Sequence, residues 1–386
     1  IALFAAVRTV SNTAYRMVYP FLPVFARLLG VDLGTMSLAL SARSATGALG
    51  PLLAPFTDRR GRRFGLTLGL GLFTAGTLLG AAGSGFLLFA AALILMTVGK
   101  YVIDPAVLAH LSDVVPYARR GRALALTELS WSLAFILGVP AAGFLLGRFG
   151  TRAPFAVLAF LGLAGFIAVR FLLKAGTGAG TASASVPGEG TGHRASYKAV
   201  LRSPAALAGI AVILAVSMSN ELVNLVFGVW LEDSFGLKLA ALGAAAAIIG
   251  AAEFGGESLV VATVDRIGKT KALMIGLAGN AFAALLLPLA GGTTIAALAG
   301  LAFFYLTFEY TVVSLLPVMS EILPRARATL LAFYAASFSV GRAVGSLLSP
   351  RLYLLGFTAV ALTAVALDAV AFVFLIRLRR LTERAR

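Results

Sequence analysis

The sequence predicts an all-α membrane protein with about twelve transmembrane helices in two parallel-repeat six-helix bundles. Hydrophobic residues make up 60% of the 386 residues and charged residues only 12%, with a mean hydropathy of +0.95. So few charges cannot cover the surface of a water-soluble globule. The apolar residues form about twelve runs of the roughly 20 residues that a spanning helix needs. Segments of the second half also repeat segments of the first half at a nearly constant offset.

The apolar runs give the expected helices to within a few residues at each end. A stretch rich in Gly, Ser and Thr cannot bury a core, so we expect a cytoplasmic linker at 175–203. It would join an N-terminal six-helix bundle, 1–174, to a C-terminal six-helix bundle with a basic tail, 204–386. The expected helices are 3–29, 33–56, 64–83, 86–112, 122–147 and 152–174, followed by 204–231, 239–263, 269–290, 294–319, 327–351 and 355–378.

Two charged loops occupy equivalent places in the two halves. The sequence Asp-Arg-Arg-Gly-Arg-Arg at 58–63 is followed 207 residues later by Asp-Arg-Ile-Gly-Lys-Thr-Lys at 265–271. Each arginine would cost roughly 2.5–3.5 kcal/mol in hydrocarbon, so each loop should be a tight cytoplasmic hairpin between two membrane helices. Ser-Asp-Val-Val-Pro at 112–116 likewise recurs as Ser-Glu-Ile-Leu-Pro at 320–324, at an offset of 208. Six spans per repeat preserve orientation, so the two halves are parallel repeats.

The loop pair resembles the signature of the major facilitator superfamily, in which G-x-x-x-D-R-x-G-R-R lies between helices 2 and 3 and recurs more weakly between helices 8 and 9. Ala54 and Val261 stand where the family has its first glycine. The resemblance implies secondary transport by rocking of two six-helix halves, with the charged loops holding the cytoplasmic side closed. The gating residues that it implies are Asp58, Arg59, Gly61, Arg62, Asp113, Asp265, Arg266, Gly268 and Glu321.

The fifth predicted helix contains Gly-Val-Pro-Ala-Ala-Gly at 138–143. It resembles the G-P-x-x-G-G motif of the antiporters and exporters of the same family, which implies a drug/proton antiporter-like protein. Small residues and a proline bend let one helix slide closely over another. The alternative is a general packing surface, because Gly and Pro are common in spanning helices.

The basic residues gather on alternate connections between the predicted helices. The net charge is +16, and the Lys and Arg residues of the connections and termini divide 21 to 5 between the two sides. By the positive-inside rule this places both termini in the cytoplasm. We expect the chain to lie in the cell (plasma or inner) membrane. The distribution argues against nucleic acid as a partner. The expected partners are a small-molecule substrate, protons and membrane lipids, and we expect a monomer.

The residue types argue against enzymatic chemistry. The chain has no Cys, and its only histidines are His110 and His193. Thiolate chemistry is thereby excluded, and a zinc site is not expected. An intramembrane hydrolase would need a Ser–His or paired-Asp arrangement or a metal, for which the histidines are too few and badly placed. We therefore expect no catalytic residue, no metal and no cofactor.

Thirteen ionisable residues fall within the predicted spans, where their cost in hydrocarbon makes them candidates for the site. They are Arg8, Arg16, Arg43, Lys100, Arg170, Arg342, Asp104, Glu128, Glu221, Glu253, Glu257, Glu309 and Asp368. The resemblance places helices 1, 4, 7 and 10 around a central cavity. The expected substrate-binding residues are Asn12, Arg16, Tyr19, Lys100, Asp104, Asn220, Glu221, Asn224, Tyr305 and Glu309. For proton coupling we expect Glu221, with Glu128 and Glu309 in reserve; Lys100 and Asp104 can also neutralise each other one helical turn apart.

The two halves differ in the sign of their membrane charges, +3 in the first and −4 in the second. A polarised cavity would suit a small amphipathic compound that is cationic or zwitterionic, although the same charges can serve as bridges between the halves. The sequence therefore predicts alternating access, with proton-coupled efflux as the first choice. Uptake of a polar solute by a symporter, flipping of a lipid-like substrate and a non-transporting membrane sensor with the transporter fold are the alternatives.

Overall fold

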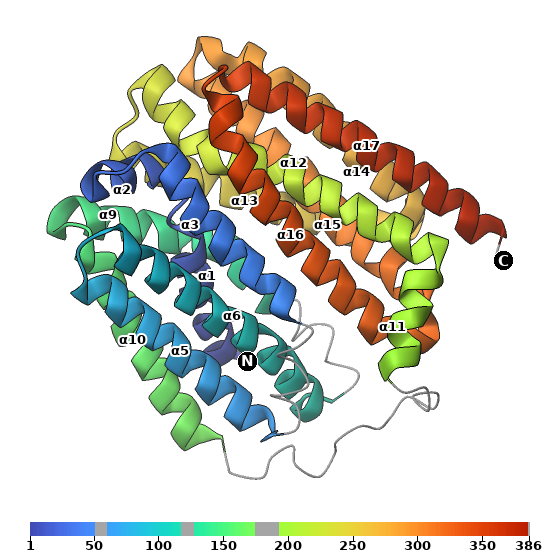
Figure 1. Cartoon of the computed structure of the whole chain (residues 1–386), viewed down its shortest axis with the longest axis horizontal. Helices are drawn as coiled ribbons and strands as arrows, with labels where there is room; N and C mark the ends of the chain where they lie inside the picture. The colour runs from blue at the N-terminus through green and yellow to red at the C-terminus, as the bar shows by residue number, and fades with distance from the viewer. Residues whose placement is uncertain (51–59, 117–126, 174–192, 385–386) are drawn as a thin grey trace. The chain divides into compact units, whose positions relative to one another are not determined.

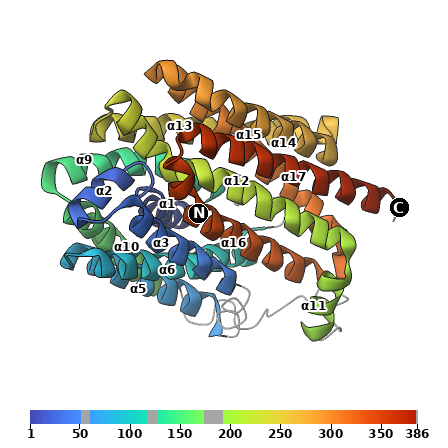
Figure 2. The same ribbon diagram turned by 45° about the horizontal axis from the view of Figure 1, so that its top comes forward.

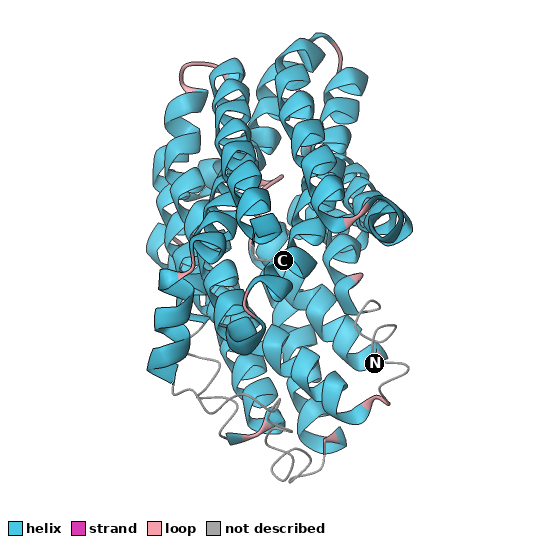
Figure 3. Cartoon of the chain, turned by 90° about the vertical axis from the view of Figure 1, so that its right-hand side faces the viewer, coloured by secondary structure: helices cyan, strands magenta, loops and turns pink. Residues whose placement is uncertain are grey.

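The computed structural model describes residues 1–50, 60–116, 127–173 and 193–384. These ranges contain helices, turns and loops but no strand (Figure 3). Ten of their helices are long and apolar enough to cross a membrane, or up to eleven if one sharply bent pair counts as a span. The predicted all-α membrane fold is confirmed, with ten to eleven candidate spans in the described ranges against the twelve or so expected.

The contacts divide the chain into two compact units. Unit 1 comprises Ile1–Ala184 with Gly236–Gly250, and unit 2 comprises Ser185–Phe235 with Ala251–Arg386. The helix α13 (Leu239–Ile267) contributes to both units.

Unit 1 is helical throughout its described elements. In chain order they are α1 (Ala2–Arg16), α2 (Leu22–Leu29), α3 (Leu33–Ala45), α5 (Arg62–Ala82), α6 (Phe86–Val114), α8 (Ser130–Leu133), α9 (Val139–Phe149) and α10 (Arg152–Leu172). Helix α5 packs against both α6 and α10 (Figure 1). At Gly99 a Cβ would lie 2.6 Å from the backbone nitrogen of Phe73, so the absence of a side chain lets α6 approach α5 closely.

The first predicted helix, 3–29, is wrong as a single element. The chain leaves the helical path after Arg16, turns through 17–21 and resumes as α2. Pro20 lies in the turn and Pro23 in the first turn of α2, and a proline cannot donate a backbone hydrogen bond to continue a helix. The chain then bends by 113° between α2 and the helical stretch Leu33–Leu49, which begins with α3. Tyr19 consequently lies in the turn between two helices, not on the polar face of one continuous helix.

The segment with the antiporter-like motif is irregular in a specific way. A π-helical turn, Ala134–Gly138, joins α8 to α9 just before Pro140. Single π turns within α-helices are rare and frequently occur at functional sites. A Cβ at Gly138 would clash with the side chain of Thr13 on α1. This glycine therefore allows α1 to pack directly against the irregular turn.

Unit 2 has α12 (Pro204–Phe235) at its centre. Its other helices are α11 (His193–Arg202), the second part of α13, α14 (Lys269–Leu286), α15 (Thr294–Ile322), α16 (Arg327–Tyr353) and α17 (Phe357–Arg384). Of the most apolar window of α12, 78% is buried, and the helix packs against α15, α16 and α17. Figure 2 shows α17 lying between α12 and α14. The core includes Val212, Val216, Leu277, Leu315, Leu330 and Leu375.

The predicted linker 175–203 is described only at its end. Residues 175–192 lie outside the described residues, and His193–Arg202 form the helix α11. This helix packs against α12 and α16 of unit 2.

Candidate functional site

Arg8 of α1 joins two carboxylates from other helices in unit 1. Its Nε lies 3.3 Å from Asp104 Oδ1, and its Nη1 and Nη2 lie 2.7 and 3.3 Å from the two oxygens of Glu128. Lys100 forms a second ion pair with Asp104 from one helical turn away on α6. The expected Lys100–Asp104 contact is present, as part of a network with two cations and two anions. Such mutual compensation lets charges remain inside a membrane protein.

Two further arginines of unit 1 are held by aromatic rings and carbonyl oxygens. Arg16 donates to the carbonyl oxygen of Trp131 at 3.0 Å, with its Cζ 3.4 Å from the ring centroid of Phe135. Arg43 of α3 is fully buried and donates to the carbonyl oxygen of Tyr15 at 2.9 Å, with its Cζ 4.1 Å from the Tyr15 ring. A guanidinium over a ring gains from the quadrupole of the π system. These contacts fix both arginines within the bundle.

The remaining predicted residues of unit 1 lie around the same rings. Asn12 is fully buried and donates to Ser130 Oγ at 3.2 Å. The rings of Tyr19 and Tyr15 are 6.3 Å apart, and Lys100 Nζ lies 5.7 Å from the Trp131 ring. We call the charged set of this region the cationic cluster; it comprises Arg8, Arg16, Arg43, Lys100, Asp104 and Glu128. It contains two more cations than anions and is rimmed by aromatic side chains.

Unit 2 has a buried network around Glu221 of α12. The Glu221 side chain is fully buried, and its Oε2 lies 2.7 Å from Arg342 Nη2 of α16. Ser346 Oγ donates to Oε1 at 2.7 Å, and Asn224 Nδ2 donates to Oε2 at 3.2 Å. Tyr305 of α15 extends the network by donating to Asn224 Oδ1 at 2.7 Å. We call these five residues the Glu221 network.

The structure brings together only some of the predicted residues of unit 2. Glu221, Asn224 and Tyr305 belong to the Glu221 network. Asn220 and Glu309 are buried on α12 and α15, with 2% and 9% of their surface exposed. Neither belongs to the Glu221 network, so substrate binding by these two residues stays a prediction.

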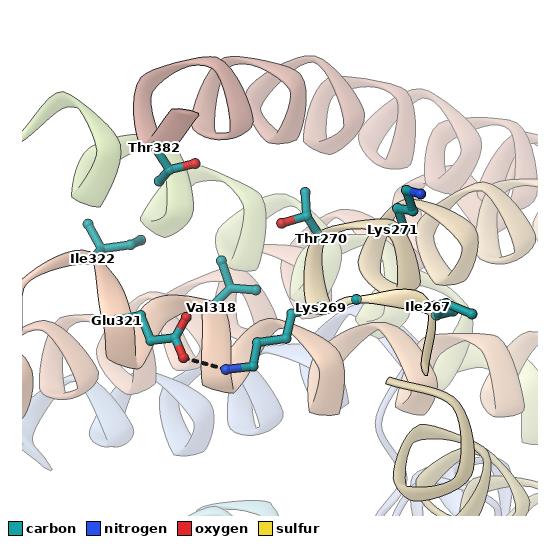
Figure 4. A pocket seen from close by; sticks show the side chains of 9 residues that line it. Ile267, Lys269, Thr270, Lys271, Val318, Glu321, Ile322 and Thr382 are labelled. Atoms are coloured by element: carbon teal, nitrogen blue, oxygen red, sulfur yellow. Dashed lines mark hydrogen bonds and ion pairs between the residues drawn. The ribbon is translucent and has the colours of Figure 1, made fainter. Parts of the chain in front are cut away.

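The charged loops show the internal repeat in atomic detail. Gly61 and Gly268 precede α5 and α14 with φ of 88° and 87°, a backbone conformation that favours glycine. The next residue pairs with an acid near the end of a neighbouring long helix: Arg62 Nε lies 3.1 Å from Asp113 Oδ2, and Lys269 forms an ion pair with Glu321 (Figure 4). Each unit thus joins the start of one helix to the end of the next. Asp58 and Arg59 lie outside the described residues, and Asp265 and Arg266 are exposed at the end of α13.

A hollow of about 730 Å³ lies beside the second loop. Its lining mixes polar and apolar side chains, among them Lys269, Thr270, Glu321, Val318 and Ile322 (Figure 4). Because it lies at the helix ends beside the charged loop, we assign it to the loop region.

Sequence reasoning missed several residues of these clusters. Arg43 was recognised as a charge within a span but not as a site residue, and Trp131 and Ser346 were not selected. The sequence does contain a signal for Ser346, because it lies one helical turn from Arg342 and so shares a helix face with it. No such signal marks Trp131, whose carbonyl oxygen is the acceptor for Arg16. In the described ranges no group of three or more His, Cys, Asp or Glu residues could hold a metal ion.

Comparison with known proteins agrees with this architecture. The family model described as "Major Facilitator Superfamily" matches residues 4–320. The chain is 27% identical over 373 residues to the uncharacterized MFS-type transporter YwfA of Bacillus subtilis, covering 92% of this chain and 86% of that protein. It is 29% identical over 159 residues to Multidrug resistance protein 2 of the same organism, covering 41% of this chain and 40% of the relative.

A solved structure gives the same fold. The inward-facing, unoccupied structure of a bacterial homolog to the human lysosomal transporter Spinster superposes with a TM-score of 0.78 at 14% identity, covering 100% of this chain and 97% of the other. The charged-loop repeat, the helical fold and the family match all support the same assignment. The chain belongs to the Major Facilitator Superfamily and is a multi-pass membrane transporter of a small molecule.

Proposed function

We propose that the protein exports a small amphipathic compound by alternating access, with proton entry as the driving force. The cationic cluster of unit 1 is the observation that carries the substrate class. Its two excess cations and its aromatic rim suit a ligand with an anionic group and an apolar body. Within the cationic or zwitterionic compounds suggested by the sequence, the cluster favours the zwitterion.

Proton coupling in this proposal uses Glu221. Its carboxylate forms an ion pair with Arg342, and a proton added to it would cancel the attraction within the pair. Loss of that attraction would free α16 to move relative to α12. Glu128, paired with Arg8, and Glu309 are the reserve candidates. Protonation can thereby be linked to a conformational equilibrium.

Two observations support efflux as the proposed direction of transport. The first is the irregular segment 134–143, where the antiporter-like sequence gives a π turn and a close helix contact. The second is the similarity over 41% of this chain to a protein named for multidrug resistance. We further propose that the protein works as a monomer in the cell membrane with both termini in the cytoplasm.

The deciding experiment is flux in proteoliposomes with an imposed pH gradient. We would compare three amphipathic fluorophores of similar size: a cation, a zwitterion and an anion. Gradient-driven movement of the zwitterion against its concentration gradient, opposite to the proton flow, is expected. Movement in the same direction as the protons would indicate an uptake symporter, and transbilayer movement of labelled lipid would indicate a flippase. No flux of any compound in folded protein would favour the sensor.

A further inference from the structure

Asp368 of α17 is a buried acid that lies outside the Glu221 network. Only 1% of its surface is exposed. Asn280 Nδ2 of α14 donates to its Oδ2 at 2.8 Å, and the hydroxyl of Ser219 on α12 lies beside the same carboxyl group. Its Oδ1 is buried and has no hydrogen-bond partner among the described residues. The surroundings thus offer the carboxyl neutral partners only.

A second layer of polar groups surrounds these neutral partners. Thr307 Oγ1 of α15 is 3.3 Å from Asn280 Oδ1, and its single hydrogen is shared between this oxygen and the nearer carbonyl oxygens of Phe303 and Phe304. Ser219 Oγ is 3.1 Å from the carbonyl oxygen of Ala364, to which it can donate. Ser219, Asn280, Thr307 and Asp368 therefore connect α12, α14, α15 and α17 through buried polar side chains. We call these four residues the Asp368 cluster.

No opposite charge compensates Asp368 within the described part of the chain. The helices that pack against α17 or belong to the Asp368 cluster carry the following titratable and charged groups: Glu221, Glu232, Asp233, Lys269, Lys271, Tyr305, Glu309, Tyr310, Glu321, Arg327, Tyr334, Arg342, Arg351 and Tyr353. None of the ion pairs of the described residues includes Asp368. Glu221 differs from Asp368 in this respect, because Arg342 Nη2 lies 2.7 Å from its Oε2.

The protonation state follows from this difference in surroundings. An ionised carboxylate without a counter-charge is far more costly to bury than a neutral acid, which needs only hydrogen bonds. Protonation at Oδ1 would also give this oxygen a hydrogen bond, because Oδ1–H can donate while Oδ2 accepts from Asn280. A Ser219 hydroxyl that donates to Ala364 keeps a lone pair with which to accept that hydrogen.

We propose that the Asp368 cluster is a proton-binding site of unit 2, which holds one proton in the conformation described here. It is distinct from the proton-coupling role proposed for Glu221 and does not depend on it. The ligand is a proton and not a metal cation, since Asn280 presents its NH₂ group to the carboxyl and the part of the chain that the structure describes holds no metal-binding group of acids or histidines.

The test is infrared spectroscopy of the purified full chain as a function of pH. Incorporation of ¹³C-labelled aspartate would separate the carbonyl stretch of its seven aspartates from that of its glutamates. We expect an aspartic acid band at a pH at which exposed aspartates are ionised, and loss of this band when the pH is raised further. Asp368→Asn should remove this band, whereas the control Asp233→Asn, at an exposed acid that accepts from Tyr353, should leave it intact. A band that persists unchanged in Asp368→Asn would overturn the proposal.

A second variant covers the case in which Asp368→Asn does not fold. Asn280→Ala keeps the acid but removes the donor to Oδ2, so the carbonyl stretch of a protonated Asp368 should shift to higher frequency. A matched change outside the cluster, Thr263→Ala, which removes a hydroxyl that contacts Tyr310, should leave the band in place. An unshifted band in folded Asn280→Ala would show that the proton is not on Asp368. Since neither measurement involves transport, failure of the proposed efflux activity would not affect the result.

Discussion

Arg342 and Glu221 form a buried ion pair, with Nη2 of the arginine 2.7 Å from Oε2 of the glutamate. The pair joins α16 to α12, and Ser346 and Asn224 each donate a further hydrogen bond to the carboxylate. Removing one partner of such a pair typically costs about 3–5 kcal/mol, because the other charge stays buried alone. The Glu221 carboxylate is thus an anchor between two helices of unit 2.

Glu221→Gln should abolish proton-driven accumulation of substrate while sparing part of the gradient-free exchange. The amide keeps the size of the side chain but cannot exchange a proton. It also leaves Arg342 without its carboxylate, so thermal stability should fall, and Glu221→Gln with Arg342→Gln should regain part of it. Transport with and without a pH gradient, combined with melting curves, measures both effects.

The control for this prediction is Glu383→Gln, which alters an exposed ion pair with Arg379 at the end of α17. Exposed pairs contribute at most about 1 kcal/mol, so this variant should behave as wild type. A Glu221→Gln protein that still concentrates substrate with the normal pH dependence would exclude Glu221 and direct attention to Glu309 and Glu128.

Arg16 should contribute to the affinity for substrates that carry a carboxylate or phosphate. Hydrogen bonds to charged groups are worth about 1.5–3 kcal/mol, so Arg16→Ala should weaken binding by about tenfold or more. Arg16→Lys should restore the charge but not the forked geometry, and should give an intermediate affinity. Equilibrium binding of a zwitterionic substrate and of its uncharged analogue separates these effects. Equal affinity in all three proteins would assign Arg16 a structural role only.

Local patterns in the sequence predicted much of the fold and part of the site. Lys100 and Asp104 were identified as partners because they are one helical turn apart on the same helix. The ion pairs Arg8–Glu128 and Glu221–Arg342 join residues more than a hundred positions apart, and their register is set by helix packing. The interruption after Arg16 was missed for a different reason: apolar residues continue through it, and only Pro20 and Pro23 indicate the turn.

The ion pair between Arg62 and Asp113 should influence the conformational equilibrium of the transporter. Asp113→Asn removes a partner of the first charged loop and should change the ratio of the two access states more than the amount of folded protein. Exchanging the charges, Arg62→Asp with Asp113→Arg, should return the ratio towards wild type. Since the chain has no native cysteine, accessibility labelling of single introduced cysteines can report this ratio without background. An unchanged ratio in Asp113→Asn would contradict the prediction.

Gly268 should be more sensitive to substitution than glycines of ordinary conformation. Its φ of 87° is strained for any residue with a Cβ, although no atom lies within 4 Å of the position that a Cβ would take. Gly268→Ala should therefore destabilise the protein by about 1–2 kcal/mol through backbone strain alone. Gly291→Ala is the matched control, because its Cβ would also meet open space but its φ is not positive. Melting curves of the two variants should differ, with only Gly268→Ala unfolding at lower temperature.

Strain at Gly268 would also disturb the Lys269–Glu321 ion pair, so cysteine accessibility in unit 2 should change in the same variant. If the two glycine variants have the same melting temperature, the positive φ of Gly268 is not a requirement of the folded state.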